Sequence, residues 1–221
     1  MPDFRGGVLD LDGVVVDTEA LHLEATMMVF DRHGLSMPGD DPGAWIGRTD
    51  RDIFNEVLEK AGRQDLDVDS LLSRKHDVYG EIVHRIQAIP GSRDFIRAVA
   101  ASPLRLGLAT SSERINQQRA FDALGLDGFF DAVVTATDVT RTKPDPEPYR
   151  LAVARLKLEP SDCFVVEDSF NGVRSARDAG CHAIGLSTSF SEERLLAAGA
   201  LKVVHSFDEL YDYVGVRKGD H

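Results

Sequence analysis

Two aspartates near the start of the chain have types and spacing that suit phosphate chemistry. Asp10 and Asp12 lie one residue apart, Asp10 interrupts the apolar run at residues 8–11, and Gly13 follows. After a strand that ends in a turn, one such carboxylate can act as a nucleophile while the other transfers protons. A divalent cation would let both stay ionised beside a phosphate. A solvated turn is the competing interpretation, whereas an EF-hand loop is excluded because Val14 stands where a metal ligand belongs.

Three hydroxyl residues follow a second apolar run. Thr110, Ser111 and Ser112 come directly after residues 105–109. A hydroxyl and the free backbone N–H groups of such a turn can bind phosphate oxygens. The alternative is an ordinary helix N-cap ahead of Glu113.

One lysine and a second pair of acids complete the candidate groups. Lys143 stands three residues before Pro146, which could open a helix. A fixed ammonium group there would offset charge on a carboxylate nucleophile and on a transferred phosphoryl group. Glu167 and Asp168 follow another apolar run and could supply oxygen ligands to Mg²⁺. A surface lysine and a helix cap are the competing interpretations.

Short apolar runs that alternate with helical patterns must position these groups. Strands are predicted at residues 8–11, 105–109, 132–135, 163–166, 182–186 and 201–204. Helices are predicted between them, at residues 92–101, 116–124, 146–156, 172–179 and 191–198. This alternation predicts an α/β fold with a doubly wound parallel sheet and helices on both faces. All four candidate segments then follow strand ends, at the edge where such sheets bind ligands.

One long segment departs from the alternating pattern. Residues 18–88 are helical throughout, with apolar residues at helical spacing in 19–33, 50–61 and 68–86. We therefore expect a catalytic core domain of residues 1–17 and 89–221 and an inserted helical cap domain of residues 18–88. A cap inserted after the first strand is expected to close over the site.

Composition narrows the possible partners. The chain has 221 residues, 43% of them hydrophobic, and a formal net charge of −12. Nucleic acid and anionic membranes are not expected partners, because binding them relies on Lys and Arg. No apolar run is long enough to span a membrane. Cys163 and Cys181 suggest free thiols in a reducing cytoplasm, and nothing in the sequence assigns an oligomeric state.

The candidate groups, taken in order, resemble the motifs of a known family. Asp10-x-Asp12-Gly13, Thr110, Lys143 and Glu167-Asp168 are similar to the four motifs of the haloacid dehalogenase superfamily, in its phosphatase-type branch with a helical cap. The resemblance extends from residue 8 to about residue 186. It implies a Rossmann-like core, Mg²⁺ as the cofactor and a small phosphorylated metabolite as the substrate.

The resemblance also implies a role for each matching residue. Asp10 would be the nucleophile and Asp12 the general acid and base. Asp10, Asp168 and the backbone carbonyl of Asp12 would bind Mg²⁺, and Glu167 would assist directly or through water. Thr110 and Lys143 would hold the phosphoryl group. Dehalogenase activity is not expected, since the founding dehalogenases lack the second aspartate.

Within this branch, the chain most resembles β-phosphoglucomutases and related sugar-phosphate phosphatases. His22 matches their hinge segment, although a partly buried histidine without a hinge role is an equal alternative. Lys75, with Arg74, resembles a basic pair of their cap, but a solvated helix face is the stronger interpretation. Trp45, Arg48, Asp50 and Lys75 are the candidates to face the substrate.

One departure from the mutase pattern favours hydrolysis. Asp50 replaces the cap arginine that would hold the second phosphate of a bisphosphate intermediate. A phosphatase that forms an aspartyl-phosphate is therefore preferred, with a β-phosphoglucomutase-type phosphotransferase as the alternative. A phospho-accepting receiver-like signalling module is a third hypothesis, but receivers have no helical insertion and accept phosphate on a later strand.

Overall fold

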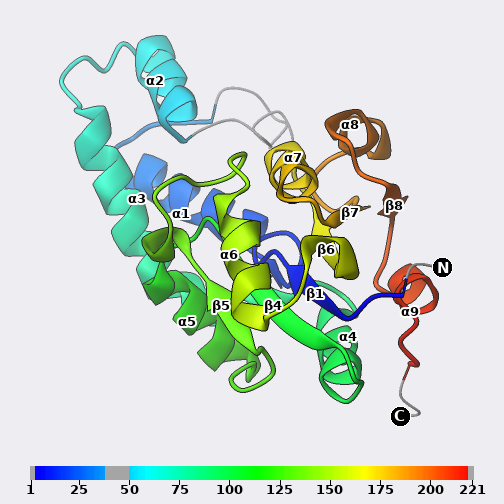
Figure 1. Ribbon diagram of the computed structural model, residues 1–221. Coiled ribbons are helices and arrows are strands. Elements are labelled where there is room, and N and C mark those ends of the chain that lie inside the picture. The colour runs from blue at the N-terminus through cyan, green and yellow to red at the C-terminus, as the bar shows by residue number, and fades with distance from the viewer. Residues whose placement is uncertain (1–2, 38–49, 219–221) are drawn as a thin grey trace. The chain divides into compact units, whose positions relative to one another are not determined.

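A computed structural model describes residues 3–37 and 50–218 (Figure 1). The chain forms two compact units, which we describe separately. One is an α/β unit of Met1–Asp17 and Gln87–His221, and the other is a helical unit of Thr18–Ile86.

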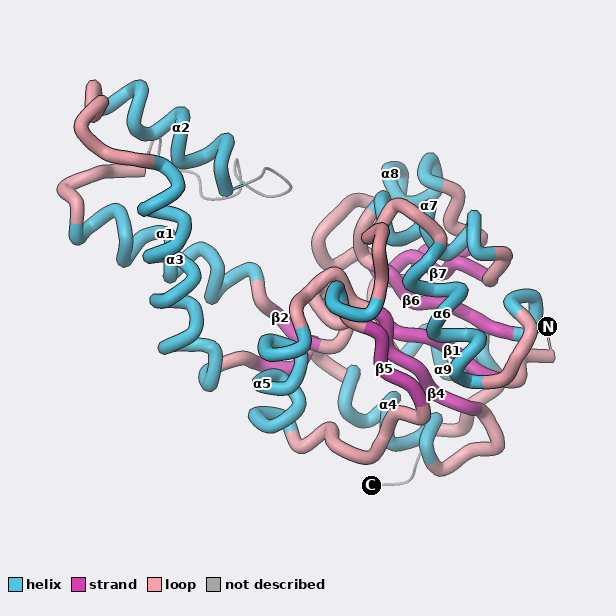
Figure 2. The backbone as a smooth tube through the Cα atoms, turned by 60° about the vertical axis from the view of Figure 1, so that its left-hand side comes forward, coloured by secondary structure: helices cyan, strands magenta, loops and turns pink. Residues whose placement is uncertain are grey.

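A six-stranded sheet with the order β5-β4-β1-β6-β7-β8 forms the centre of the α/β unit (Figure 2). All its pairings are parallel, which confirms the predicted fold class. Because the chain proceeds outward from β1 first to one side and then to the other, the order reverses at β1. Ligands bind at such a reversal, beyond the carboxyl ends of the strands. The strands are β1 (Gly6–Leu9), β4 (Arg105–Ala109), β5 (Ala132–Val134), β6 (Cys163–Glu167), β7 (His182–Leu186) and β8 (Lys202–Val204).

Helices cover both faces of this sheet. Val165 of β6 belongs to a core shared with Tyr149 and Val173, which lie on α6 and α7. The adjacent residue Phe164 points to the opposite face, as strand geometry requires, and its ring lies 6.5 Å from that of Phe95 on α4. The helices of this unit are α4 (Ser92–Ala100), α5 (Arg114–Leu124), α6 (Glu147–Leu156), α7 (Phe170–Ala179), α8 (Glu192–Ala198) and α9 (Asp208–Val214).

Two short elements differ from the sequence prediction. Residues 87 and 88, which we expected in the helical segment, form β3 (Gln87–Ala88), antiparallel to β2 (Val16–Asp17). Helix α9 was not predicted. Strands of two residues are too short for their periodicity to be recognised in the sequence.

The helical unit contains α1 (Glu19–Arg32), α2 (Asp50–Ala61) and α3 (Val68–Ile82), followed by the 3₁₀ turn η2 (Val83–Arg85). The Asp67 side chain caps α3 by accepting a hydrogen bond from the Ser70 N–H (2.9 Å). Phe30 of α1 packs against Phe54 of α2, with ring centroids 4.9 Å apart. The apolar faces of the amphipathic helices are therefore buried against one another.

Candidate active site

The turn after β1 places two carboxylates at the centre of the sheet edge. The Asp10 N–H still donates to the Val166 carbonyl of β6 (3.1 Å), so Asp10 is held in register with the sheet. The chain then turns at Gly13, whose φ of +74° lies in the left-handed region that favours glycine. A Cβ at Gly13 would lie 1.9 Å from Oδ2 of Asp168. Only glycine therefore lets this turn approach the acid that follows β6.

Lys143 joins two of the acids. Its Nζ donates to Oδ1 of Asp10 (2.7 Å), to Oε1 of Glu167 (2.7 Å) and to the Ala109 carbonyl (2.9 Å). The lysine side chain is 6% exposed and that of Glu167 is 0% exposed. Burial alone would lower the pKa of Lys143, but the carboxylates of Asp10 and Glu167 raise it above its ordinary value. The lysine is therefore a permanent cation in the site.

Three acids crowd around this single ammonium group. Asp10, Glu167 and Asp168 each offer one oxygen, and these oxygens lie within 4.8 Å of one another. Burial raises the pKa of Asp10 well above its ordinary value, and Glu167 and Asp168 raise it further against the opposing effect of Lys143. Burial and the neighbouring Glu167 raise the pKa of Asp168 to about 7. Close-set carboxylate oxygens with excess negative charge are the donor set that hard divalent cations prefer.

Glu167 is the most thoroughly held of the three acids. Oε1 accepts hydrogen bonds from Lys143 and from the Tyr149 hydroxyl (2.7 Å), and Oε2 accepts from the N–H (3.1 Å) and hydroxyl (3.0 Å) of Ser169. A Cβ at Gly172 would lie 1.7 Å from Oε1, so the first turn of α7 packs directly on this carboxylate. Tyr149 is not among the predicted site residues, because a tyrosine on a helix face resembles any other core residue.

Asp12 lies beside the turn that follows β4. Its Oδ2 accepts a hydrogen bond of 2.6 Å from the Ser112 hydroxyl and a longer one of 3.3 Å from the Thr110 hydroxyl. Thr110 is buried, and its N–H extends the ladder to β5 by donating to the Val134 carbonyl (3.0 Å). Ser111, the predicted phosphate-binding serine of this turn, is exposed. The sequence places Ser112 in the same hydroxyl turn but assigns it no role of its own.

A polar segment after β7 also reaches the site. The Ser189 hydroxyl donates to Oδ2 of Asp168, and the Thr188 hydroxyl donates to the Gly13 carbonyl (2.5 Å). Neither residue was predicted. The signal was available, because residues 187–189 follow a predicted strand at the edge where the other candidates lie.

Three of the cap candidates, His22, Lys75 and Asp50, have partners within the helical unit. The His22 ring stacks on Tyr79, with centroids 4.3 Å apart and planes inclined by 8°. Lys75 is 5% exposed and forms an ion pair with Asp50, so the expectation of a solvated helix face for Lys75 is wrong. Trp45 and Arg48 lie outside the described residues.

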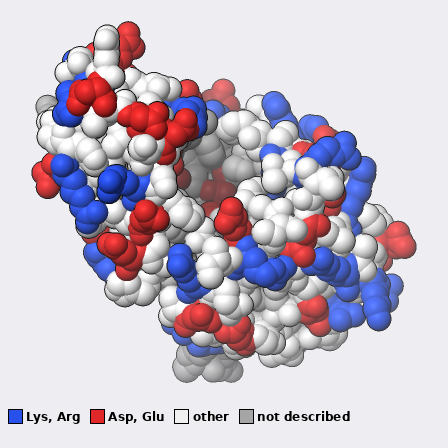
Figure 3. Space-filling view, turned by 90° about the vertical axis from the view of Figure 1, so that its left-hand side faces the viewer, with Lys and Arg blue, Asp and Glu red and all other residues white. Residues whose placement is uncertain are grey.

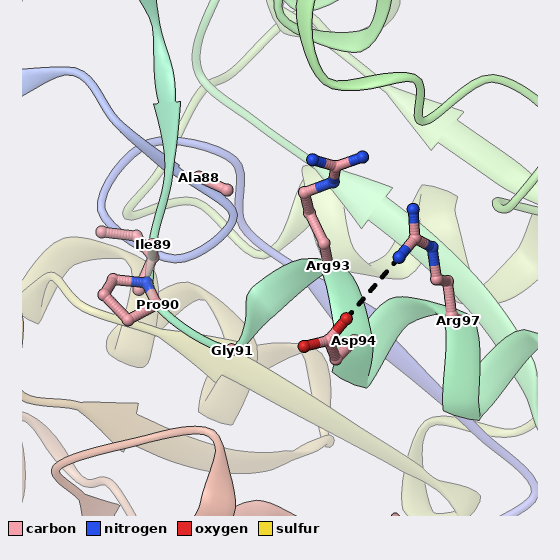
Figure 4. A pocket seen from close by; sticks show the side chains of 7 residues that line it. All are labelled: Ala88, Ile89, Pro90, Gly91, Arg93, Asp94 and Arg97. Atoms are coloured by element: carbon pink, nitrogen blue, oxygen red, sulfur yellow. Dashed lines mark ion pairs between the residues drawn. The ribbon is translucent and has the colours of Figure 1, made fainter. Parts of the chain in front are cut away.

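A shallow pocket lies elsewhere in the α/β unit, where β3 leads into α4 (Figure 4). Two arginines and one acid of α4 line it, and Arg97 pairs with Asp94 at 3.6 Å. None of the acids of the cluster lines it. Its lining residues are Ala88, Ile89, Pro90, Gly91, Arg93, Asp94 and Arg97.

Known proteins resemble this chain in both sequence and fold. The family model of haloacid dehalogenase-like hydrolases matches residues 8–186. The chain is 32% identical over 203 residues to a phosphorylated carbohydrates phosphatase of Thermotoga maritima, covering 89% of this chain and 92% of that protein. It is 30% identical over 201 residues to a validoxylamine A 7'-phosphate phosphatase of Streptomyces hygroscopicus subsp. limoneus, covering 90% and 92%.

A solved structure agrees with this assignment. A Thermotoga maritima protein provisionally assigned as a β-phosphoglucomutase matches with a TM-score of 0.83 at 29% identity, covering 96% of this chain and 99% of that one. The range that the family model matches contains every acid of the cluster, the lysine and the hydroxyl turn. The chain therefore belongs to the haloacid dehalogenase-like hydrolases, as a phosphoric monoester hydrolase.

Proposed function

We propose that this enzyme is a magnesium-dependent phosphatase that hydrolyses a small sugar phosphate through an aspartyl-phosphate on Asp10. One observation carries the proposal: Lys143 Nζ lies 2.7 Å from both Asp10 and Glu167. The lysine fixes Oδ1 of Asp10, and we assign Oδ2 as the attacking oxygen. A pre-positioned carboxylate beside a permanent cation suits phosphoryl transfer, which depends on positioning and charge stabilisation.

Two displacements at phosphorus complete the proposed cycle. Oδ2 of Asp10 bonds to phosphorus as the bond from phosphorus to the ester oxygen breaks, and Asp12 protonates the departing oxygen. Water then attacks the acyl phosphate while Asp12 accepts its proton, which releases phosphate and restores both aspartates. Thr110, Ser111 and Lys143 would bind the phosphoryl oxygens throughout.

The acid cluster fits Mg²⁺. Asp10, Asp168 and Glu167 offer only oxygen ligands, and Lys143 is the one buried cation described among them. Asp10 and Asp168, with the Asp12 carbonyl, would hold the ion, and Glu167 would support it while holding Lys143. Bound magnesium would supply positive charge that lets the acids stay ionised and offsets the charge of the phosphoryl group.

The sugar-phosphate substrate is inferred from the relatives and from charge. One relative acts on phosphorylated carbohydrates, as its name states. Acidic and basic side chains are interspersed on the face shown in Figure 3, and the formal net charge is −12. A phosphate ester therefore has to be attracted by local groups such as Lys143, not by the whole surface.

Among the described residues, no helix has the length and apolar character needed to cross a membrane.

Hydrolysis is favoured over mutase activity by the helical unit. A mutase has to hold a bisphosphate at both ends, which requires a free cation for the distal phosphate. The buried Lys75 is instead paired with Asp50. A receiver-like role is not supported, because the chain belongs to a hydrolase family and the acid that we assign as acceptor follows the first strand.

Turnover measurements test the proposal. The purified protein is incubated with Mg²⁺ and a panel of phosphorylated sugars, and released phosphate is measured. β-Glucose 1-phosphate with its bisphosphate activator is included to detect mutase products. We expect phosphate release that EDTA abolishes and Mg²⁺ restores, and rapid quenching should trap a hydroxylamine-labile phosphoprotein. Isomerisation without phosphate release would favour the mutase, and turnover in excess EDTA would contradict the metal assignment.

A further inference from the structure

The shorter of the two hydrogen bonds that Oδ2 of Asp12 accepts from the turn after β4 comes from a serine that the catalytic scheme above does not use. The Ser112 hydroxyl lies 2.6 Å from Oδ2 of Asp12, whereas the Thr110 hydroxyl lies 3.3 Å from the same oxygen. A hydrogen bond to a carboxylate strengthens steeply as it shortens and straightens. Ser112 is therefore the main side-chain partner of Asp12 in this turn.

The Ser112 backbone is anchored on both sides, so its hydroxyl is placed in advance. The Ser112 N–H donates to the Thr110 hydroxyl oxygen (3.0 Å), which closes a tight turn at the end of β4. The Ser112 carbonyl accepts from the N–H of Ala136 (3.0 Å), in the segment that follows β5. A hydroxyl carries a single proton to donate, and this geometry directs it to Asp12.

We propose that Ser112 is a positioning residue that selects which oxygen of Asp12 delivers the proton. Oδ2 accepts two hydrogen bonds from the turn, so a proton on the neutral acid resides on Oδ1. That proton moves to the ester oxygen as the bond between phosphorus and the ester oxygen breaks. The Ser112 hydroxyl keeps its own proton throughout. This inference rests on the proposed role of Asp12 as the general acid.

The dependence of rate on the leaving group tests this role. Proton donation matters most when the departing oxygen is strongly basic, as in phenyl phosphate, and least when it is weakly basic, as in p-nitrophenyl phosphate. We compare kcat/KM for the two esters, with Mg²⁺ present, because this parameter reports the step that expels the leaving group. In Ser112→Ala the ratio of the p-nitrophenyl to the phenyl value should rise by about tenfold, the worth of one hydrogen bond to a charged group.

Two further variants separate the possible outcomes. Asp12→Ala should raise the ratio at least as much as Ser112→Ala. Ser161→Ala removes an exposed serine before β6, at the strand end away from the site, and should leave the ratio at the wild-type value. A purely structural effect of Ser112→Ala would lower both rates equally without changing the ratio.

Failure of this inference is distinguishable from failure of the catalytic scheme. If Asp12→Ala raises the ratio and Ser112→Ala does not, Ser112 has no positioning role and the scheme stands. If Asp12→Ala leaves the ratio unchanged, Asp12 is not the general acid, and both the scheme and this inference are overturned.

Discussion

Two groups of charged side chains in the α/β unit contrast in their balance of charge. In the candidate active site, Lys143 is the one cation described among Asp10, Glu167 and Asp168, and it pairs with the first two. Elsewhere, Asp138 alone accepts hydrogen bonds from both Arg114 (2.5 Å) and Arg155 (2.9 Å). The first group has more carboxylates than ammonium groups, whereas the second has two guanidinium groups for one carboxylate.

The pKa values of the acids in the two groups are shifted in opposite directions, because the two groups differ in their balance of charge. In the acid cluster, burial and mutual repulsion raise the pKa of Asp10 and of Asp168. For Asp138, burial alone would raise the pKa, but hydrogen bonds from Thr135 and the guanidinium groups of Arg155 and Arg114 lower it. An acid that has every partner it needs stabilises the fold, whereas the shortage of positive charge in the acid cluster is the feature on which our proposal of a bound cation rests.

The largest expected effect is the loss of catalysis when Asp10 is replaced. Asp10→Asn should lower kcat for p-nitrophenyl phosphate with Mg²⁺ by about 10⁴-fold or more, since it removes the nucleophile. The matched change Asp138→Asn, which also replaces a carboxylate by an amide, should leave kcat near the wild-type value. Activity of Asp10→Asn within tenfold of wild type would remove the nucleophile assignment.

Removing the Lys143 ammonium group increases the charge imbalance of the acid cluster. Lys143→Met should lower kcat by about 10²–10³-fold, because a preorganised cation no longer offsets charge in the transition state. It should also lower the free energy of unfolding in EDTA by about 3–5 kcal/mol, because the buried carboxylates lose their partner. Steady-state kinetics and urea unfolding measure the two effects. Arg155→Met, in the balanced group, is the control and should cost less stability and no activity.

A rise in pH should make the metal-free protein less stable, whereas bound Mg²⁺ should make it more stable. A raised pKa means that the folded protein binds more protons than the unfolded chain, so Asp168 should make the metal-free protein less stable as pH rises from about 4 to about 7. Saturating Mg²⁺ should stabilise the protein by about 3 kcal/mol at neutral pH, and less at pH 5. Thermal unfolding with EDTA or Mg²⁺ at both values checks this. Equal stabilisation by Mg²⁺ at both pH values, or an unchanged response in Asp168→Asn, would count against a cation at this cluster.

The smallest expected effect concerns the balanced group. Asp138→Asn should reduce the free energy of unfolding at pH 7 by about 1 kcal/mol, since its arginine partners are partly exposed. Because the pKa of Asp138 is depressed in the folded state, its contribution is complete above its ordinary pKa of 3.8 and declines as pH falls from that value towards the much lower folded-state pKa. The difference between wild type and variant in urea unfolding should therefore be smaller at pH 3 than at pH 7. An equal difference at both pH values would show that packing, not charge, stabilises the loop.

The sequence alone determined the strands of the sheet and the sheet edge at which the candidate groups lie. Alternating apolar runs and helical patterns predicted six parallel strands, with bounds at residues 105–109 and 182–186 that match β4 and β7. Because parallel strands end at one edge, residues that follow them in sequence are brought together whatever their separation along the chain. Asp10 and Lys143, 133 residues apart, thus meet.

Only the tertiary structure decided which side chains hold these groups in place. Tyr149, Ser112 and Ser189 bond to Glu167, Asp12 and Asp168 respectively. Such bonds depend on packing to within a few tenths of an ångström, which no periodicity in the sequence encodes. The same holds for Lys75, whose burial and pairing with Asp50 follow from the packing of α3 and α2. Position along the chain brings the candidate groups together, and close packing selects the partners that orient them.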